Sequence, residues 1–276
     1  MDLNTVSEVR RPASRENLAT WREGDAWLAG GTWLFSEPQP DVRRLVDLFG
    51  LGWEPLTVND NGLEIAATCT ITELSRFART LPATAAPLFE QCCRAFLASF
   101  KIWNMATVGG NICMSLPAGA LISLTTALEG QCTIWNGEGG ERRVAIEEFV
   151  TGVHENVLRP GDLLRKIDLP VSALRKHAGF RRMSLTHLGR SSVLLIATLC
   201  PDTGSFSLMV SAATVRPLRI EFAGIPTSQE LAHRIDEAIP GELYFDDVHG
   251  SPRHRKHLTY YFAEELRREL SAKDRT

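Results

Sequence analysis

The segment Leu28-Ala-Gly-Gly-Thr-Trp33 and the later segment Ala106-Thr-Val-Gly-Gly-Asn111 both place a pair of glycines beside small polar side chains. Each segment follows an apolar run. Glycine allows the backbone to reach positive φ and to approach a ligand closely. Successive N–H groups of such a loop can form a concavity for phosphate oxygens. Thr32, Thr107 and Asn111 add side-chain hydrogen-bond donors. Taken singly, each glycine pair is also typical of a structural turn; two loops that converge on one diphosphate would form a dinucleotide site.

Other nucleotide motifs are missing from the 276 residues. The chain has no GxGxxG pattern, which disfavours a standard nicotinamide site, and no Walker pattern, which disfavours an ATPase or GTPase. The 30 Lys and Arg against 33 Asp and Glu give a formal net charge of −3. This balance provides no global field for nucleic acid or for an anionic membrane.

The spacing of the six cysteines does not match that of a metal site. None forms a CxxC pair or has a histidine at zinc-finger spacing, and none has the close spacing of iron–sulfur ligands. We therefore expect free thiols in a reducing compartment. The first residues lack the apolar core of a secretory signal, and runs such as 193–199 are too short to span a bilayer. These features predict a cytoplasmic protein without a membrane span.

The pattern of apolar runs, turns and caps predicts an α+β fold, because strands and helices alternate without a regular βαβ rhythm. The boundary is placed near residue 171, where antiparallel strands begin. We expect a domain over 1–170 in two lobes, roughly 1–50 and 51–170, and a second domain over 171–276. Expected strands cover 42–48, 63–67, 132–135, 142–146, 163–169, 180–183, 193–199, 205–213 and 219–222, and expected helices cover 14–21, 72–80, 86–100, 121–128, 228–238 and 252–270.

Five segments together resemble the flavin-binding medium subunits of molybdenum hydroxylases. This family includes those of three-subunit xanthine dehydrogenases, carbon monoxide dehydrogenases and 4-hydroxybenzoyl-CoA reductases. Its patterns AGGTxL, RNxATxGGN, SPAGD and FxxG…LxPGELL are similar to Ala29–Leu34, Trp103–Asn111, Ser115–Ala120, and Phe149–Gly152 with Leu158–Leu164. The tail, with Asp246, Ser251 and Arg255, also resembles the family's closing pattern. The resemblance covers nearly the whole chain in the expected order.

The resemblance implies a two-lobed FAD domain of the vanillyl-alcohol-oxidase type, followed by a smaller C-terminal α+β domain. FAD would lie between the lobes without a covalent bond, its diphosphate on the glycine loops. Leu163 or Leu164 matches the family position near the isoalloxazine ring. The cofactor-binding residues implied are Leu28, Ala29, Gly30, Gly31, Thr32, Trp33, Asn104, Thr107, Val108, Gly109, Gly110, Asn111, Leu163 and Leu164.

Several positions depart from the family pattern. Trp33 and Ala120 stand where the family often has Asp, and Trp103 stands where it usually has Arg. Trp27, Trp33 and Trp103 flank the glycine loops and either stack on a ring of the cofactor or belong to the core. No histidine lies near either loop in sequence, and Cys113 is interpreted as a small packed residue, so non-covalent FAD is expected.

The implied function is that of an oxidoreductase flavoprotein subunit, similar to xanthine dehydrogenases, with no catalytic residue for the organic substrate. Its partners would be a molybdenum-cofactor large subunit and a [2Fe–2S] small subunit, and its FAD would pass electrons to NAD or another acceptor. Two alternatives stay open: a flavin-free scaffold subunit, and a free-standing flavin oxidase. The basic stretch with His249, His254 and His257 is interpreted as a solvated helix start.

Overall fold

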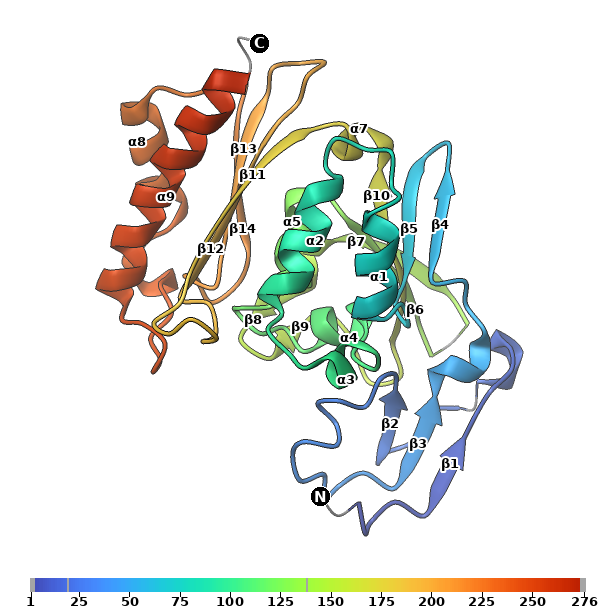
Figure 1. Cartoon of the computed structure of the whole chain (residues 1–276). Coiled ribbons are helices and arrows are strands. Elements are labelled where there is room, and N and C mark those ends of the chain that lie inside the picture. Colours follow the sequence, from blue (N-terminus) through green and yellow to red (C-terminus); the bar gives the residue numbers. More distant parts are fainter. Residues whose placement is uncertain (1–2, 19, 138, 274–276) are drawn as a thin grey trace.

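The computed structural model describes residues 3–18, 20–137 and 139–273. Figure 1 shows a small N-terminal sheet at one end, a central body, and two C-terminal helices on the far side. The N-terminal strands are all parallel, in the order β1-β3-β2. They are β1 (Glu8–Arg10), β2 (Asp25–Leu28) and β3 (Arg44–Asp47).

This first lobe has little core. Its buried residues, within the described part of 1–50, are Pro12, Arg44, Leu45, Val46 and Leu48. A unit of this size rarely buries enough apolar surface to be stable by itself. The first lobe therefore depends on contacts with the second. The predicted helix over 14–21 is reduced to a 3₁₀ turn over Arg15–Asn17, since Ser14 makes no capping hydrogen bond from its side chain.

The central body is a five-stranded antiparallel sheet covered by helices. The strand order is β4-β5-β10-β6-β7. The strands are β4 (Leu56–Asn59), β5 (Gly62–Ala66), β6 (Gln131–Trp135), β7 (Glu141–Ala145) and β10 (Leu163–Pro170), and a small hairpin is formed by β8 (Val150–Gly152) and β9 (Glu155–Asn156). The helices are α1 (Ile71–Ala78), α2 (Ala86–Ala95), α3 (Phe100–Trp103), α4 (Val108–Cys113), α5 (Ala120–Ala127), α6 (Ile146–Phe149) and α7 (Val171–Leu174).

Local signals explain where these helices begin and end. Thr70 and Glu73 form a capping box at the start of α1. The single helix predicted over 86–100 is wrong, because α2 ends at Ala95 and Leu97 adopts a φ of 44° before α3 starts. Every residue of α5 is buried, which fits its apolar composition and its place in the interior.

The third sheet has the antiparallel order β11-β12-β13-β14. Its strands are β11 (His177–Met183), β12 (Val193–Leu199), β13 (Phe206–Ser211) and β14 (Leu218–Phe222), and the helices are α8 (Ser228–Ala238) and α9 (Pro252–Lys273). Along β12, Leu194 and Ile196 join the central core, while Val193 and Leu195 pack on the α8–α9 side. Alternate residues of a strand point to opposite faces, so this sheet is covered on both sides. The α+β prediction is confirmed; the division at residue 170 stays a prediction.

Candidate functional site

The two glycine segments meet at one cavity of about 480 Å³, which lies between the first lobe and the central body. This volume is in the range of small-molecule sites. The first segment follows β2, and the second forms the start of α4. Eight of the predicted residues line the cavity: Ala29, Gly30, Gly31, Thr32, Trp33, Thr107, Gly110 and Asn111.

Six predicted residues lie outside this lining. Val108 and Gly109 are buried under it, and Leu163 and Leu164 are buried in β10. Asn104 ends α3 and accepts a hydrogen bond from the Thr72 hydroxyl at 2.8 Å. Leu28 is the last residue of β2 and packs beside Gly31. The roles of all fourteen residues in cofactor binding stay predictions.

The backbone of the first segment has free hydrogen-bond donors. Gly31 has a φ of 67°, a conformation that favours glycine. The amides of residues 30–34 donate no hydrogen bond to another residue in the described part of the chain, whereas their carbonyls at Gly31 and Trp33 accept from the amides of Phe35 and Ser36. Buried or half-buried amides require partners. This segment therefore suits an anionic ligand.

The second segment differs from the expectation. Its amides are already used: Val108 donates to the carbonyl of Cys69, and Gly109 donates to that of Ala67. The amide of Gly110 donates to the Thr107 hydroxyl at 3.0 Å. The expectation that this segment offers its backbone N–H groups to phosphate oxygens stays a prediction, and these amides have other partners here: those of Val108 and Gly109 tie α4 to the strand-to-helix connection at residues 67–70, and that of Gly110 caps the helix on Thr107. The side chains of Thr107 and Asn111 remain as possible donors.

The glycines of the second segment have separate roles. A Cβ on Gly109 would lie 2.5 Å from the Cβ of Ala67 and 2.6 Å from its carbonyl oxygen. A Cβ on Gly110 would meet only the Thr107 hydroxyl, at 3.0 Å, and Gly110 lines the cavity. Gly109 thus permits packing of α4 on Ala67, the residue after β5, whereas Gly110 leaves space for a ligand.

The cavity lining carries no Asp, Glu, Lys or Arg among the described residues. The side-chain oxygen of Asn111 accepts a hydrogen bond from the Leu121 amide at 3.1 Å. The NH₂ group of the same side chain is therefore left to donate to a ligand. The apolar part of the cavity lining also includes Phe96, Ile102, Met114 and Leu116. Sequence reasoning missed these four, although three of them stand within five residues of a predicted position.

A histidine lies beside the first segment in space, although none is near either glycine segment in sequence. The ring centroid of His154 is 5.6 Å from that of Trp33, at an interplanar angle of 45°. Sequence distance hid this contact, because His154 comes from the turn between β8 and β9. Cys113 also lines the cavity, and burial raises the pKa of its thiol to about 12. The thiol is therefore protonated at neutral pH and a poor nucleophile.

The three tryptophans that flank the glycine segments in sequence line two different cavities. Trp27 and Trp33 line the cavity, and the Trp27 indole N–H donates to the carbonyl of Asp162 at 2.9 Å. Trp103 lines a different cavity, with Leu97 and Leu188, so its departure from the family pattern does not alter the wall between the glycine segments. Ala120 is buried and likewise absent from this wall.

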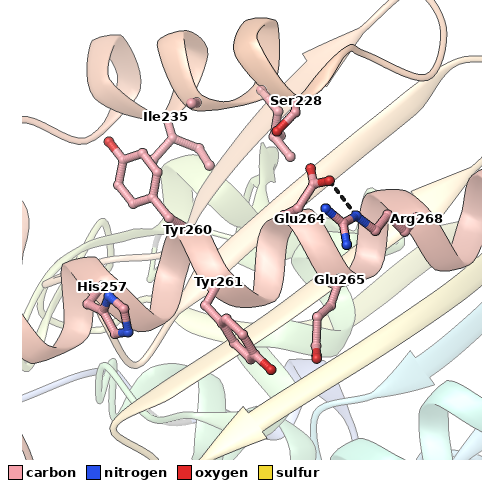
Figure 2. Close-up of a pocket in the computed structure, with 10 residues that line it drawn as sticks. Ser228, Ile235, His257, Tyr260, Tyr261, Glu264, Glu265 and Arg268 are labelled. Atoms are coloured by element: carbon pink, nitrogen blue, oxygen red, sulfur yellow. Dashed lines mark hydrogen bonds and ion pairs between the residues drawn. The ribbon is translucent and has the colours of Figure 1, made fainter.

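A second hollow of about 470 Å³ lies between α8 and α9. Figure 2 shows Ile235 and Tyr260 along it, with Glu264 and Arg268 joined by an ion pair of 2.7 Å. Hydrogen bonds from Arg267 and Arg268 lower the pKa of Glu264 to about 2, although burial opposes this shift. Because Glu264 is already paired with Arg267 and Arg268 of the same helix, the hollow is a weaker candidate for a binding site than the first cavity.

The start of α9 is solvated only in part: Arg253, Lys256 and His257 are exposed, as expected, whereas Arg255 is buried. The Arg255 side chain is 1% exposed and donates to the carbonyl of Gly250 at 2.9 Å, to the carbonyls of Ser192 and Ala212, and to Asp247. It therefore fixes the chain around β12 and β13. Among the described residues, no group of three His, Cys, Asp or Glu side chains is arranged to hold a metal ion. Across the described ranges, no helix has the length and apolar character needed to cross a membrane.

Comparison with known proteins gives matches over the same regions. The family model described as the FAD binding domain in molybdopterin dehydrogenase matches residues 5–172. Xanthine dehydrogenase 1 of Arabidopsis thaliana is 30% identical over 121 residues, which are 42% of this chain and 9% of that protein. Caffeine dehydrogenase subunit beta of Pseudomonas sp. (strain CBB1) is 27% identical over 119 residues, 43% of this chain and 38% of that subunit.

Among solved structures, a chain of quinoline 2-oxidoreductase from Pseudomonas putida 86 has a TM-score of 0.77 and 20% identity. The match covers 99% of each chain. This likeness extends over the third sheet and its helices as well as the glycine segments, and it shows that the whole fold is shared.

Proposed function

The chain belongs to the family of FAD-binding domains of molybdopterin dehydrogenases, and from this premise we propose that it is the FAD-carrying electron-transfer subunit of a multi-subunit molybdenum hydroxylase. Its cofactor is FAD. The observation that carries the proposal is the convergence of both glycine segments, from two lobes, on one cavity.

The residues of the cavity fit FAD in their chemistry. The unpartnered amides of residues 30–34 would donate to the diphosphate, helped by the hydroxyls of Thr32 and Thr107 and by the NH₂ group of Asn111. The apolar wall at Ile102, Met114 and Leu116 would exclude water from the rings. Bound FAD supplies the ability to accept and release electrons, while the protein supplies position and electrostatics.

The proposed partners are a molybdenum-cofactor subunit and a [2Fe–2S] subunit, and the proposed acceptor is NAD or another oxidant. The relatives support this assembly: the plant xanthine dehydrogenase is far longer than the matched segment, and the Pseudomonas relative is named as a subunit. In this proposal the organic substrate is oxidised in the molybdenum subunit, and this chain acts in the flavin step.

The first test is the visible spectrum of the purified chain after incubation with FAD, repeated after acid precipitation. Flavin bands that move to the supernatant support non-covalent FAD, and Cys113→Ser should retain the same bands. A chain that stays colourless with added FAD would favour the scaffold alternative.

The second test is affinity purification of the tagged full chain from its native host, followed by molybdenum and iron analysis. Both metals and two further subunits are expected. Reduced flavin in this complex should be reoxidised by NAD or by another added acceptor. Steady turnover of an alcohol by the lone FAD-loaded chain would contradict the subunit proposal in favour of a free-standing oxidase.

A further inference from the structure

Trp33 reaches from the first lobe to the β8–β9 hairpin of the second lobe. Its indole lines the cavity, and its ring contacts that of His154. Aromatic pairs at such separations are attractive beyond their burial. The contact therefore fixes the orientation of the indole and joins the two lobes beside the site.

The backbone that presents His154 is strained. His154 has a φ of 61° and Ser115 a φ of 50°, both in the left-handed region that non-glycine residues rarely adopt. The two residues are joined directly, since the amide of His154 donates to the carbonyl of Ser115 at 3.0 Å. Such strain persists where the surroundings impose it, and it gathers at ligand clamps.

The same hairpin also holds the cavity wall. The side-chain NH₂ of Asn156 donates to the carbonyl of Cys113 at 2.9 Å and to the hydroxyl of Ser115 at 3.3 Å. Cys113 and Met114 line the cavity. The β8–β9 hairpin thus positions both the wall and, through His154, the indole that faces the same space.

We propose that Trp33 is the platform on which a planar ring of FAD packs, and that His154 is its positioning residue. The inference rests on the proposed function, because it needs FAD in this cavity. An indole is a suitable platform: it offers a large apolar face in a wall without charged side chains.

The test separates a positioning role from a structural one by using the strain. His154→Gly removes the imidazole and its contact with Trp33 but relieves the φ of 61°, so the two effects on stability oppose each other and the melting temperature of the apoprotein should change little. FAD affinity, measured by calorimetric titration, should fall about threefold to tenfold. Trp33→Leu should lose affinity by a similar factor, whereas Trp33→Phe should retain most of it. His233→Ala, an exposed histidine on α8, is the control and should change neither value.

Titration with FMN and with ADP identifies the ring. Weaker FMN binding by Trp33→Leu indicates packing on the isoalloxazine, and weaker ADP binding indicates packing on adenine. Wild-type affinity for FAD in both Trp33→Leu and His154→Gly would overturn the inference while leaving the proposed function intact. A His154→Gly variant that loses affinity and stability together would reduce His154 to a structural residue. A wild-type chain that binds no FAD would overturn the proposed function, and this inference with it.

Discussion

Gly30 and Met105 touch through their backbones: a Cβ on Gly30 would lie 1.7 Å from the carbonyl oxygen of Met105. Gly30 belongs to the first lobe, and Met105 belongs to the connection between α3 and α4. The two segments that line the cavity are therefore in direct contact, and only glycine permits this approach. The width of the cavity depends on that contact.

Gly30→Ala should separate the two segments. No side-chain rotation relieves an overlap with a carbonyl oxygen, so the first lobe must shift away from the second. We expect FAD affinity to fall by more than about tenfold, since displacement of a positioned donor costs at least ~1.4 kcal/mol. Calorimetric titration with FAD measures this loss. Gly224→Ala, where a Cβ meets nothing within 4 Å, is the matched control. Equal affinities of the two variants would contradict the importance of the contact.

Gly109→Ala should chiefly lower the stability of the protein, whereas Gly110→Ala should chiefly lower its affinity for FAD. A methyl group on Gly109 would overlap Ala67, and overpacking of this kind costs about 1–3 kcal/mol of stability. A methyl group on Gly110 would extend into the cavity, and alanine favours the helical conformation of α4. Gly110→Ala should therefore lose FAD affinity with only a small loss of stability from the contact with the Thr107 hydroxyl, whereas Gly109→Ala should lose much more stability. Thermal unfolding and FAD titration of both variants decide this, and a pair of variants with the same profile would refute the division of roles.

Local signals in the sequence predicted most regular elements and singled out the two glycine segments, whereas the meeting of these segments at one site was implied by the family resemblance. Capping residues such as Thr70, alternating apolar residues in β12 and paired glycines act over a few positions. The family resemblance then supplied the cofactor. The eight predicted residues that reach the cavity are all in or beside the two glycine pairs.

What the sequence could not predict depends on contacts between distant residues. His154 meets Trp33 only because the β8–β9 hairpin folds against the segment around Ser115. The amides of Val108 and Gly109 are used because the residues after β5 pass beside α4. Trp103 stands one position from Ile102, yet helical geometry directs the two side chains to different cavities.

FAD affinity should depend only weakly on salt. No charged side chain lines the cavity in the described part of the chain, so its contacts with the diphosphate would be made by amides, hydroxyls and a carboxamide. Ionic strength screens interactions between charges far more than hydrogen bonds to neutral donors. We expect less than about a threefold change in the dissociation constant between about 50 and about 500 mM salt, because the screening length, ~10 Å at about 0.1 M, governs interactions between charges. Calorimetric titration across this range tests it; a steep salt dependence would indicate that an arginine or lysine outside the lining reaches the cofactor.

Acid should loosen the first lobe through Asp25. Its carboxylate accepts from Arg44 at 2.7 Å, and both side chains are nearly fully buried. Burial acts to raise the pKa of Asp25, but the hydrogen bonds from Arg44 and from the Arg22 amide outweigh it, so the pKa is lowered. A carboxyl with a lowered pKa in the folded state adds stability above its unfolded pKa of about 4, and this stability is lost as the pH falls through the folded pKa.

Asp25→Asn should reveal how far FAD retention depends on this pair. Asp25 begins β2, which leads directly into the segment with the free amides, and the lobe has few other buried residues. Leaving Arg44 buried without its partner should cost about 3 kcal/mol at pH 7. The wild type should release FAD below about pH 4, whereas the variant should release it more readily at neutral pH and show a weaker acid dependence. Flavin fluorescence during stepwise acidification measures the release, with the exposed Asp60→Asn as control. If Asp25→Asn and wild type release FAD over the same pH range, the first lobe does not depend on this ion pair.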